Sequence, residues 1–418
     1  MGTIEGNSNN NSLVGDDSYG VTNMIYGYGG DDFLRGGFLA KNYIWGGDGN
    51  DTIEGGSQYG DFLYGEGGDD DISTFWRSFV YMNGGSGNDT LRAGSGGASL
   101  DGGKGIDTMY GGEGGDWFYV DDARDIVIEN FVPQFDNVYN PPDIVTASTS
   151  YALSSGALIE ALNVSSIKST KAINLTGNDY GQSINGNAGD NVLNGKGGND
   201  ELMGRLGADT LIGGSGTDTA RYVSATTGVT VSLAKPSINT GEAKGDTFSS
   251  IENLVGSKYA DKLYGDTAAN TLTGGAANDF LSGAAGKDKL LGEAGDDKLN
   301  GGLDADILTG GSGKDTFVFS TALGSANIDT IKDFNVKDDV IHLENSVFTK
   351  LAKTGALAAA QFVANTKGAA TDKLDRIIYE TDTGKLFYDA DGNGSGKAVQ
   401  FATLKAELAI THEDFIVI

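Results

Sequence analysis

Residues 274–317 read GGAANDFLSGAAGKDKLLGEAGDDKLNGGLDADILTGGSGKDTF, and this stretch decides the fold. It consists of consecutive nine-residue units of the form G-G-x-G-x-D-x-U-x, in which U is an apolar residue. In and just before this stretch, the sixth position of successive units is filled by Asp261, Asn270, Asp279, Asp288, Asp297, Asp306 and Asp315. The eighth position is filled in the same register by Leu263, Leu272, Leu281, Leu290, Leu299, Leu308 and Phe317. A flexible glycine-rich linker has no reason to keep aspartate and leucine in phase, so the period indicates a regular repeat structure.

The residue types in each unit fit a coil of short parallel strands. The residues x-U-x suffice for a minimal strand, and U points inward because side chains alternate across a strand. The other six residues form a tight turn, in which glycine permits positive φ and lets carbonyl oxygens face inward. One unit makes half a coil, so the turn directly above any turn lies two units further along the chain. The sequence therefore predicts an all-β fold, a parallel β-roll or β-helix solenoid.

The aspartates of the turns are expected to hold Ca²⁺. This ion takes six to eight oxygen ligands, which backbone carbonyls and carboxylates together can supply. The expected partners, two units apart, are Asp279 with Asp297, Asp288 with Asp306, and Asp297 with Asp315. Burying one leucine is worth about 2–3 kcal/mol, whereas ordering the residues of one unit costs roughly 1 kcal/mol or more for each residue. Stacked carboxylates also repel one another, so we expect metal-free repeats to be largely disordered and Ca²⁺ binding to drive folding.

The repeats fall into three blocks. The predicted organisation is an irregular block one (1–119), a β-rich spacer (120–176), block two (177–221), a second β-rich spacer (222–255), block three (256–319), and a C-terminal β-rich cap (320–418). In block one the period stretches to ten at Ile44 and Leu63, and the segment TFWRSFVYM at residues 74–82 interrupts it. In block two the sixth position holds Gln182, Asn191, Asp200, Asp209 and Asp218. An amide contributes only a neutral oxygen, so we expect weaker metal sites in block two.

The two spacers share a sequence pattern. IEALNV at residues 159–164 resembles IENLV at residues 251–255, and each segment lies shortly before a repeat block. All four prolines of the chain lie in spacers, as expected if the repeats form a ladder in which proline would remove a hydrogen-bond donor. We expect the spacers to be β-rich caps and joints and not flexible tethers.

Units of block one carry the same pattern, with GGDGNDTIE at residues 46–54, GGSGNDTLR at 84–92 and GGKGIDTMY at 102–110. The chain thereby resembles the RTX family, whose members contain hemolysin-type calcium-binding nonapeptide repeats. The resemblance implies a β-roll with Ca²⁺ as its cofactor, on the order of ten ions, bound between turns two units apart. The implied aspartate ligands are Asp31, Asp51, Asp61, Asp70, Asp89, Asp107, Asp116, Asp200, Asp209, Asp218, Asp261, Asp279, Asp288, Asp297, Asp306 and Asp315. The implied glycine ligands are Gly47, Gly49, Gly85, Gly87, Gly103, Gly105, Gly275, Gly286, Gly295, Gly302, Gly311 and Gly313.

The residues beyond 320 also resemble parts of RTX exoproteins. DTIKDFNVKDDVIHLENSVF at residues 329–348 is similar to the segment that follows the β-roll in serralysin-type proteases and lipases. Residues 376–418, which end in DFIVI, resemble the C-terminal signal of type I secretion substrates. The resemblance implies export by a type I secretion apparatus, an extracellular location, and folding outside the cell, where extracellular calcium modules bind the ion at roughly 10⁻⁴–10⁻³ M.

Asp389, Asp391 and Asn393, followed by Gly394, mimic the start of an EF-hand loop. Gln400, however, stands where the motif requires a bidentate glutamate. The flanking residues, such as KLFYD, have the character of strands where the motif requires helices. We expect a turn with at most an incidental ion.

The composition narrows the classes of partner. The chain carries 29 basic and 58 acidic residues, a net charge of −29 at pH 7, which disfavours nucleic acid and anionic lipid and favours metal cations. It has no cysteine, so disulfides and thiolate metal sites are excluded. No segment reaches the roughly 18 apolar residues that a membrane span needs. The N-terminal MGTIEGNSNNNSLVGDD lacks the basic and apolar regions of a secretory signal peptide, so we expect export without an N-terminal signal.

The sequence favours a protein without enzymatic activity. Only two histidines occur, and in HEDFI, which begins at His412, Ile416 stands where a zinc-protease motif needs its second histidine. No serine has the spacing of a nucleophile elbow. Two classes of function stay open. One is a free extracellular calcium-binding protein of adhesion, matrix or surface layers, and the other is an accessory module of a polysaccharide-modifying or proteolytic exoenzyme whose catalytic domain is separate.

Block one concentrates aromatic residues on the outward positions of its strands. These residues are Tyr26, Tyr43, Trp45, Phe62, Tyr64, Trp117 and Tyr119, with Trp76 in the interrupting segment. Exposed aromatic rows can stack on sugar rings or meet a protein partner. The simpler alternative is that neighbouring rungs stack the rings on one another. The hypothesis of a polysaccharide or cell-surface partner for block one depends on which arrangement the fold adopts.

Overall fold

The computed structural model describes residues 2–56, 59–75, 77–130, 141–351 and 353–418. These residues form short β-strands without an α-helix, together with four 3₁₀ turns, η1 (Pro236–Ile238), η2 (Gly241–Ala243), η3 (Ala359–Gln361) and η4 (His412–Asp414). None of the helices in these ranges is long and apolar enough to cross a membrane. The chain divides into two compact units, unit 1 with Met1–Gly204 and Thr210–Gly216, and unit 2 with Arg205–Asp209 and Thr217–Ile418. The division falls inside the predicted block two.

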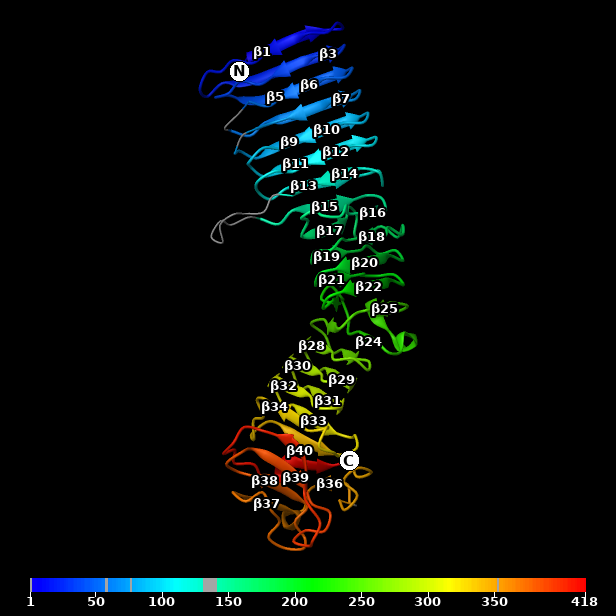
Figure 1. Cartoon of the computed structure of the whole chain (residues 1–418), viewed down its shortest axis with the longest axis vertical. Helices are drawn as coiled ribbons and strands as arrows, with labels where there is room; N and C mark the ends of the chain where they lie inside the picture. Colours follow the sequence, from blue (N-terminus) through cyan, green and yellow to red (C-terminus); the bar gives the residue numbers. More distant parts are fainter. Residues whose placement is uncertain (1, 57–58, 76, 131–140, 352) are drawn as a thin grey trace. The chain divides into compact units, whose positions relative to one another are not determined.

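Unit 1 is built from parallel strands stacked in ladders, which Figure 1 shows as successive rungs. The longest ladder runs through β1 (Gly2–Asn7), β3 (Thr22–Gly29), β5 (Lys41–Asp48), β7 (Phe62–Gly67), β9 (Val80–Ser86), β11 (Ala98–Lys104), β13 (Trp117–Val120), β15 (Ile144–Ala147), β17 (Ala161–Val164), β19 (Ser183–Asn185) and β21 (Glu201–Met203). A second ladder contains β2 (Ser12–Val14), β4 (Phe33–Arg35), β6 (Thr52–Glu54), β8 (Asp71–Ser73), β10 (Thr90–Arg92), β12 (Thr108–Tyr110) and β14 (Ile126–Ile128). A third contains β16 (Tyr151–Ala152), β18 (Leu175–Thr176), β20 (Val192–Gly197) and β22 (Thr210–Ser215).

Unit 2 repeats this architecture and ends in a mixed sheet. One parallel ladder contains β23 (Thr219–Arg221), β26 (Asn253–Val255), β28 (Thr271–Ala276), β30 (Lys289–Ala294), β32 (Ile307–Ser312) and β34 (Asp329–Ile331). The facing ladder contains β24 (Thr230–Ser232), β27 (Lys262–Tyr264), β29 (Phe280–Ala285), β31 (Lys298–Leu303), β33 (Thr316–Phe319), β35 (Val340–Leu343) and β41 (Phe415–Val417). The remaining strands are β25 (Thr247–Ser249), β36 (Gly355–Ala356), β37 (Phe362–Asn365), β38 (Ile377–Glu380), β39 (Lys385–Tyr388) and β40 (Val399–Thr403). β38, β39 and β40 pair antiparallel, and β40 joins the first ladder through β34.

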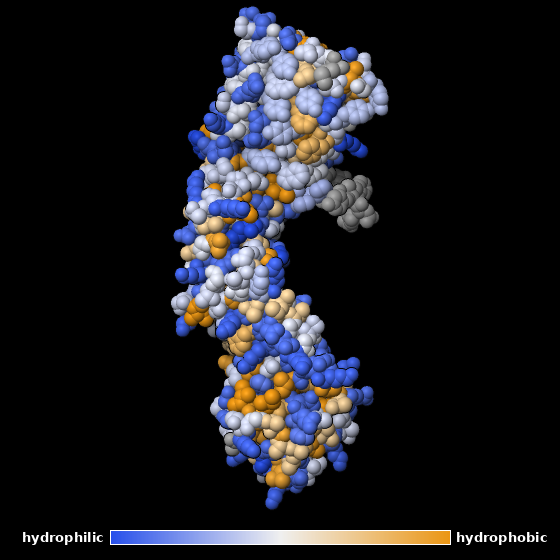
Figure 2. Space-filling model, turned by 180° about the vertical axis from the view of Figure 1, so that it is seen from behind, coloured by the Kyte–Doolittle hydropathy of each residue, from blue (hydrophilic) through white to orange (hydrophobic). Residues whose placement is uncertain are grey.

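The apolar residue at the eighth position of each repeat forms the core. In unit 2, Leu272 pairs with Leu290 and Leu290 with Leu308, and each of these side chains is fully buried. Each successive rung places its leucine directly over the previous one, because side chains alternate across a strand and the register advances by one whole coil. On the face seen in Figure 2, hydrophobic side chains are interspersed with hydrophilic ones. The parallel β-solenoid predicted from the repeat is therefore confirmed.

The stretched period of block one has a direct structural counterpart. Ile25, Ile44, Leu63 and Met82 pair in successive rungs, and the chain advances by 19 residues between each pair. The coil absorbs the extra residue in a turn, so the core register is kept. Met82 and its neighbours in β9 also show that the end of the segment at residues 74–82, read as an interruption, is a regular rung.

The spacers are β-rich, as predicted, and the described strands of the first spacer continue a ladder of unit 1. Phe118 of β13 pairs with Val145 of β15, and Val145 pairs with Leu162 of β17, all in parallel register and all fully buried. Residues 131–140, which include Pro133, lie outside the described residues. The spacer supplies apolar residues at the core position without the glycine turn, so its described strands are further rungs of the same coil.

Candidate metal centre

The aspartates at the sixth position stand one above another in the turns. In unit 2 the backbone N–H of Asp279 donates to Oδ1 of Asp297 over 2.7 Å, and that of Asp297 donates to Oδ1 of Asp315 over 3.0 Å. On the opposite edge, the N–H of Asp288 donates to Oδ1 of Asp306 over 2.8 Å. The structure thus brings together the pairs two units apart that the sequence predicted. Direct contact in each pair is made by a backbone N–H and a carboxylate oxygen.

The second oxygen of each of these carboxylates faces no donor. Oδ2 of Asp279, Asp288, Asp297, Asp306 and Asp315 is buried and accepts no hydrogen bond from any residue that the structure describes. Each of these side chains is 3% exposed or less. A buried carboxylate oxygen without a partner is costly, so such an oxygen calls for a cation or a proton.

Backbone carbonyls lie close to two of these unpartnered oxygens. A Cβ built on Gly292, at the first position of its repeat, would overlap both Oδ2 of Asp297 and the carbonyl oxygen of Gly310. The same arrangement recurs at Gly283, between Oδ2 of Asp288 and the carbonyl oxygen of Gly301. A carboxylate and a carbonyl oxygen therefore lie on the same side of the first glycine of the repeat. These carbonyls belong to glycines of the first position, whereas the predicted ligands are glycines of the second and fourth positions.

The glycines of the second and fourth positions shape the turn. All of the predicted glycine ligands have φ between +85° and +144°: Gly47, Gly49, Gly85, Gly87, Gly103, Gly105, Gly275, Gly286, Gly295, Gly302, Gly311 and Gly313. Only glycine adopts this region at little cost. Their conformation supports a structural role in the turn, and their role as metal ligands stays a prediction.

A substitution at one of these glycines tests the turn. Gly313 has φ +142°, and a Cβ there would overlap the carbonyl oxygen of Gly295. We expect Gly313→Ala to lower the free energy of unfolding by about 2 kcal/mol or more, since both strain and a backbone clash oppose it. Gly324→Ala is the control, because a Cβ at Gly324 would meet nothing within 4 Å. Equal chemical denaturation midpoints for the two variants in calcium would contradict this account.

Burial and like charges shift the acidity of these groups. Desolvation raises the pKa of Asp279 to about 7, and the neighbouring charges of Asp297 and Asp261 act in the same direction. Desolvation likewise raises the pKa of Asp306 to about 7, assisted by Asp288. The metal-free fold therefore disfavours the charged form of these two carboxylates. A divalent cation at the turn would relieve the same electrostatic cost, and the oxygen-only donor set fits Ca²⁺.

Unit 1 contains the same ladder with a longer step. The N–H groups of Asp51 and Asp70 donate to Oδ1 of the aspartate one rung further, over 2.7 and 2.8 Å, and Oδ2 of both has no donor among the described residues. Desolvation raises the pKa of Asp70 to about 8. Asp89 and Asp107 continue the ladder, with the N–H of Asp89 donating to Oδ1 of Asp107 over 2.8 Å. The predicted ligands of this edge therefore share one geometry.

The first predicted ligand of block one is displaced by one residue. Asp32, and not Asp31, occupies the buried sixth position, and its N–H donates to Oδ1 of Asp51 over 2.8 Å. Asp31 is exposed and accepts a hydrogen bond from the N–H of Asn50 over 2.9 Å. Two adjacent aspartates satisfy the sequence pattern almost equally, and only burial distinguishes them.

Two further predicted ligands already have donors on both carboxylate oxygens. Asp61 accepts hydrogen bonds from the N–H of Asn42 and of Gly56. Asp261 accepts from the N–H of Val229 over 2.7 Å and from that of Ser257 over 2.5 Å. Both oxygens of each carboxylate thus have a donor, so these two positions lack the unpartnered oxygen that Asp279 and Asp297 have.

Block two has a mixed ladder. The N–H of Gln182 donates to Oδ1 of Asp200 over 2.7 Å. The side-chain amides of Gln182 and Asn191 donate hydrogen bonds to neighbouring oxygens. These N–H groups satisfy oxygens that a cation could otherwise bind. In unit 2, the N–H of Asp209 donates to Oδ1 of Asp246 over 2.9 Å, and Asp218 is fully buried. The expectation of weaker sites in block two stays a prediction.

Carboxylates of the spacers and the C-terminal region extend the ladders, and sequence reasoning missed them. The N–H of Asp306 donates to Oδ1 of Asp329, and desolvation raises the pKa of Asp329 to about 8. The similar segments IEALNV and IENLV supply glutamates for the same role: Oε2 of Glu160 accepts from the N–H of Asp143, and Oε2 of Glu252 accepts from that of Asp218, both over 2.8 Å. The sequence feature that could have identified these residues is an acidic residue just before a short apolar strand that has no glycine turn.

The EF-hand-like segment forms the turn of a hairpin. Asp389 and Asp391 lie between the antiparallel strands β39 and β40, and the N–H of Asp391 donates to Oδ1 of Asp389 over 3.1 Å. Strands in place of helices show that this is not an EF-hand, as the sequence predicted.

The aromatic rows of block one stack on one another. The rings of Tyr26 and Trp45 lie 4.6 Å apart and nearly parallel, those of Trp45 and Tyr64 lie 5.7 Å apart, and those of Tyr43 and Phe62 lie 4.9 Å apart. Each such pair contributes about 0.5–1.5 kcal/mol. The stack directs ring faces along the ladder, which is the simpler of the two predicted arrangements. Trp76 lies outside the described residues.

Comparison with known proteins agrees with this geometry. The model of a family described as the RTX calcium-binding nonapeptide repeat (4 copies) matches residues 22–38, 41–60, 56–74, 81–97, 92–127, 176–220, 247–281, 255–290 and 282–317. These segments cover just over half of the chain. No curated protein matches it.

Proposed function

Because the chain belongs to the family with RTX calcium-binding nonapeptide repeats, we propose that it is an extracellular protein whose repeats fold when they bind Ca²⁺ outside the cell. Calcium binding itself follows from the family. The proposal adds the coupling of binding to folding, export by a type I apparatus, and a role without catalysis in adhesion, matrix or surface layers.

The stacked aspartates with one unpartnered oxygen carry this proposal. Asp279, Asp288, Asp297, Asp306 and Asp315 would hold the ions together with carbonyls such as those of Gly301 and Gly310. Bound Ca²⁺ would neutralise carboxylates that otherwise stand one above another in a buried column. A chain whose ligands come together only in the folded state gains its metal-binding free energy on folding. Low cytosolic calcium would thus keep the chain unfolded for export, and higher external calcium would fold it.

The export step is tested by removing residues 376–418, the segment that resembles a type I secretion signal. We expect the truncated chain to stay inside a bacterium that carries a type I exporter, whereas the full chain reaches the medium. Gly313→Ala is the matched control, since it perturbs a repeat turn and leaves the C-terminal segment intact; because type I export precedes folding, this variant should still be exported. Equal amounts of truncated and full chain in the medium would refute the export proposal.

A second candidate function is an accessory module for a separate exoenzyme that modifies polysaccharide or protein. Both candidates share the calcium-dependent fold and differ in what the folded chain binds. The exposure of Trp117 and Tyr119 in unit 1, 45% and 42%, supports a proposed contact with polysaccharide or the cell surface. Co-purification with matrix polysaccharide supports the first candidate, and stoichiometric co-purification with a secreted enzyme supports the second.

A further inference from the structure

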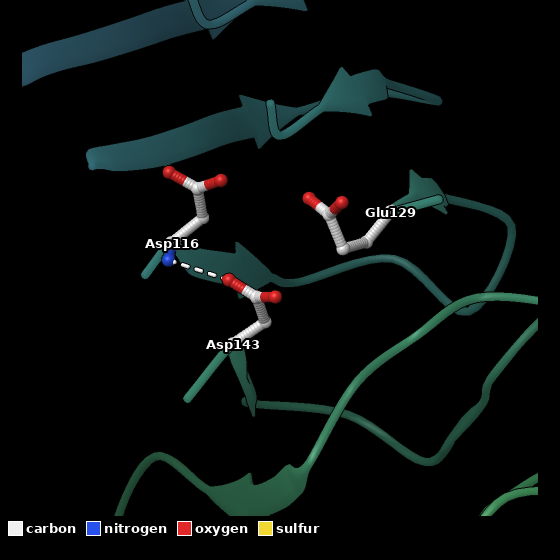
Figure 3. Close-up of side chains that lie close together, drawn as sticks. All are labelled: Asp116, Glu129 and Asp143. Atoms are coloured by element: carbon white, nitrogen blue, oxygen red, sulfur yellow. Dashed lines mark hydrogen bonds between the residues drawn. The ribbon is translucent and has the colours of Figure 1, made fainter. Parts of the chain in front are cut away.

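Three acidic side chains converge in unit 1: Asp116, at the sixth position of the last repeat of block one, and Glu129 and Asp143, which lie outside the regular spacing of the repeat. Asp116 precedes β13, Glu129 follows β14, and Asp143 precedes β15. One carboxylate oxygen from each lies within 4.8 Å of the others, and all three residues are buried. Figure 3 shows Asp116 and Asp143 on consecutive rungs, with Glu129 reaching toward them from the other side.

The hydrogen bonds of the cluster leave an oxygen directed into it. Oδ1 of Asp116 accepts from the N–H of Ala98 over 2.6 Å, and the N–H of Asp116 donates to Oδ1 of Asp143 over 2.8 Å. Oδ2 of Asp116 accepts no hydrogen bond from the described part of the chain, and this side chain is fully buried. A Cβ built on Gly111 would overlap Oε2 of Glu129 and would lie 2.7 Å from Oδ2 of Asp116. Only a residue without a side chain leaves these two oxygens room to approach.

The electrostatics of the cluster are unfavourable without a cation. Desolvation raises the pKa of Asp116 to about 8, and the charges of Asp143 and Glu129 add to the effect. Desolvation also raises the pKa of Asp143 to about 7, and the charges acting on it are those of Glu129 and Glu160. All of these neighbours are negative. Three buried carboxylates whose ligand oxygens lie within 4.8 Å of one another need either protons or a cation to offset their charge.

We propose that Asp116, the last predicted ligand of block one, forms a calcium site with Glu129 and Asp143 of the spacer, two ligands that the nonapeptide pattern does not assign. Each carboxylate directs one oxygen into the cluster, and the absence of nitrogen or sulfur in this trio favours a hard cation. Glu129 and Asp143 lie beyond the repeat segment at residues 92–127. The site joins the last repeat of block one to the first rungs of the spacer, so the ion would couple the folding of the two segments.

The test uses the full chain, Ca²⁺ as the probe, and hydrogen exchange read on peptides that span residues 108–130. Glu129→Gln keeps the shape and the acceptor for the N–H of Gly112 but removes one charge. We expect the calcium concentration that half-protects these peptides to rise about tenfold. Asp143→Asn, which can still accept from the N–H of Asp116, should give the same result. Glu113→Gln, an exposed substitution in the same turn, is the matched control and should change nothing.

The sign of the effect decides the outcome. Without a bound cation, removing one of three buried negative charges relieves repulsion, so unchanged or stronger protection in Glu129→Gln and Asp143→Asn would overturn the proposal. A higher calcium concentration for half-protection in both variants, with Glu113→Gln unaffected, supports it. Peptides from residues 274–317 separate this inference from the proposed function. If they fail to respond to calcium in the unsubstituted chain, the proposed function fails. If they respond while residues 108–130 behave alike in all variants, only this calcium site fails.

Discussion

Removal of calcium is expected to abolish most of the β-structure of the chain. In excess chelator the columns of buried carboxylates, such as Asp279, Asp297 and Asp315, lose the cations that would neutralise them, while each repeat buries too little apolar surface to fold alone. We expect the β signal in circular dichroism to fall to that of a largely disordered chain and to return on addition of calcium with a midpoint of roughly 10⁻⁴–10⁻³ M. Hydrogen exchange should show the steepest recovery for residues 256–345 and the weakest for block two. Magnesium at equal concentration is the control, since it demands a tighter octahedral geometry and should not substitute.

Acid provides an independent check on the same physics. The pKa values of Asp279 and Asp306 in the folded chain are raised to about 7, above those of an unfolded aspartate, chiefly by desolvation. Their contribution to the stability of the metal-free fold is therefore fully present below about pH 4 and is lost as the pH rises through about 7. In chelator, part of the β signal should be recovered at pH 5 relative to pH 8. A chain with the same compact signal in chelator and in calcium at pH 8 would contradict the coupling of metal binding to folding.

Neutralisation of one buried aspartate is expected to act in opposite directions with and without calcium. Asp297 is buried and its Oδ2 has no donor in the described ranges, whereas its neighbour Asp296 is exposed and accepts the N–H of Lys314 over 2.9 Å. In saturating calcium, Asp297→Asn should lower the free energy of unfolding by about 1.5–3 kcal/mol, because a charged ligand is lost from a buried site. In chelator the same change removes one charge from a repelling column, so residual structure should increase.

Asp296→Asn supplies the matched control, because it makes the same change of charge on the adjacent residue. Its effect should stay within about 0.5 kcal/mol in either condition, as for most surface substitutions. Thermal melts of the three chains in calcium and in chelator give the comparison. If Asp297→Asn and Asp296→Asn shift the melting temperature by equal amounts in calcium, the sixth position is not where the ion binds.

Much of this architecture is encoded locally. Asp288 directly precedes β30, and Leu290 is the second residue of that strand. Both side chains point inward, because side chains alternate along an extended chain. Glycine at positions such as 295 and 313 then fixes the turn, since the required φ is open to few other residues. A nine-residue period of these features leaves little choice beyond a parallel coil, so the sequence by itself determined the fold class and the pairing of Asp279 with Asp297.

Only the tertiary structure decided which acidic residues meet when the period fails. Asp31 and Asp32 are neighbours in the chain, and burial alone assigns the sixth position to Asp32. Glu129 and Asp143 reach Asp116 because the spacer strands continue the ladders, a long-range packing outcome that no repeat pattern encodes. The physical reason is that neighbouring residues of one repeat determine the contacts of that repeat. The spacer strands are instead positioned by the packing of Val145 and Leu162, which are buried and pair with each other in adjacent rungs.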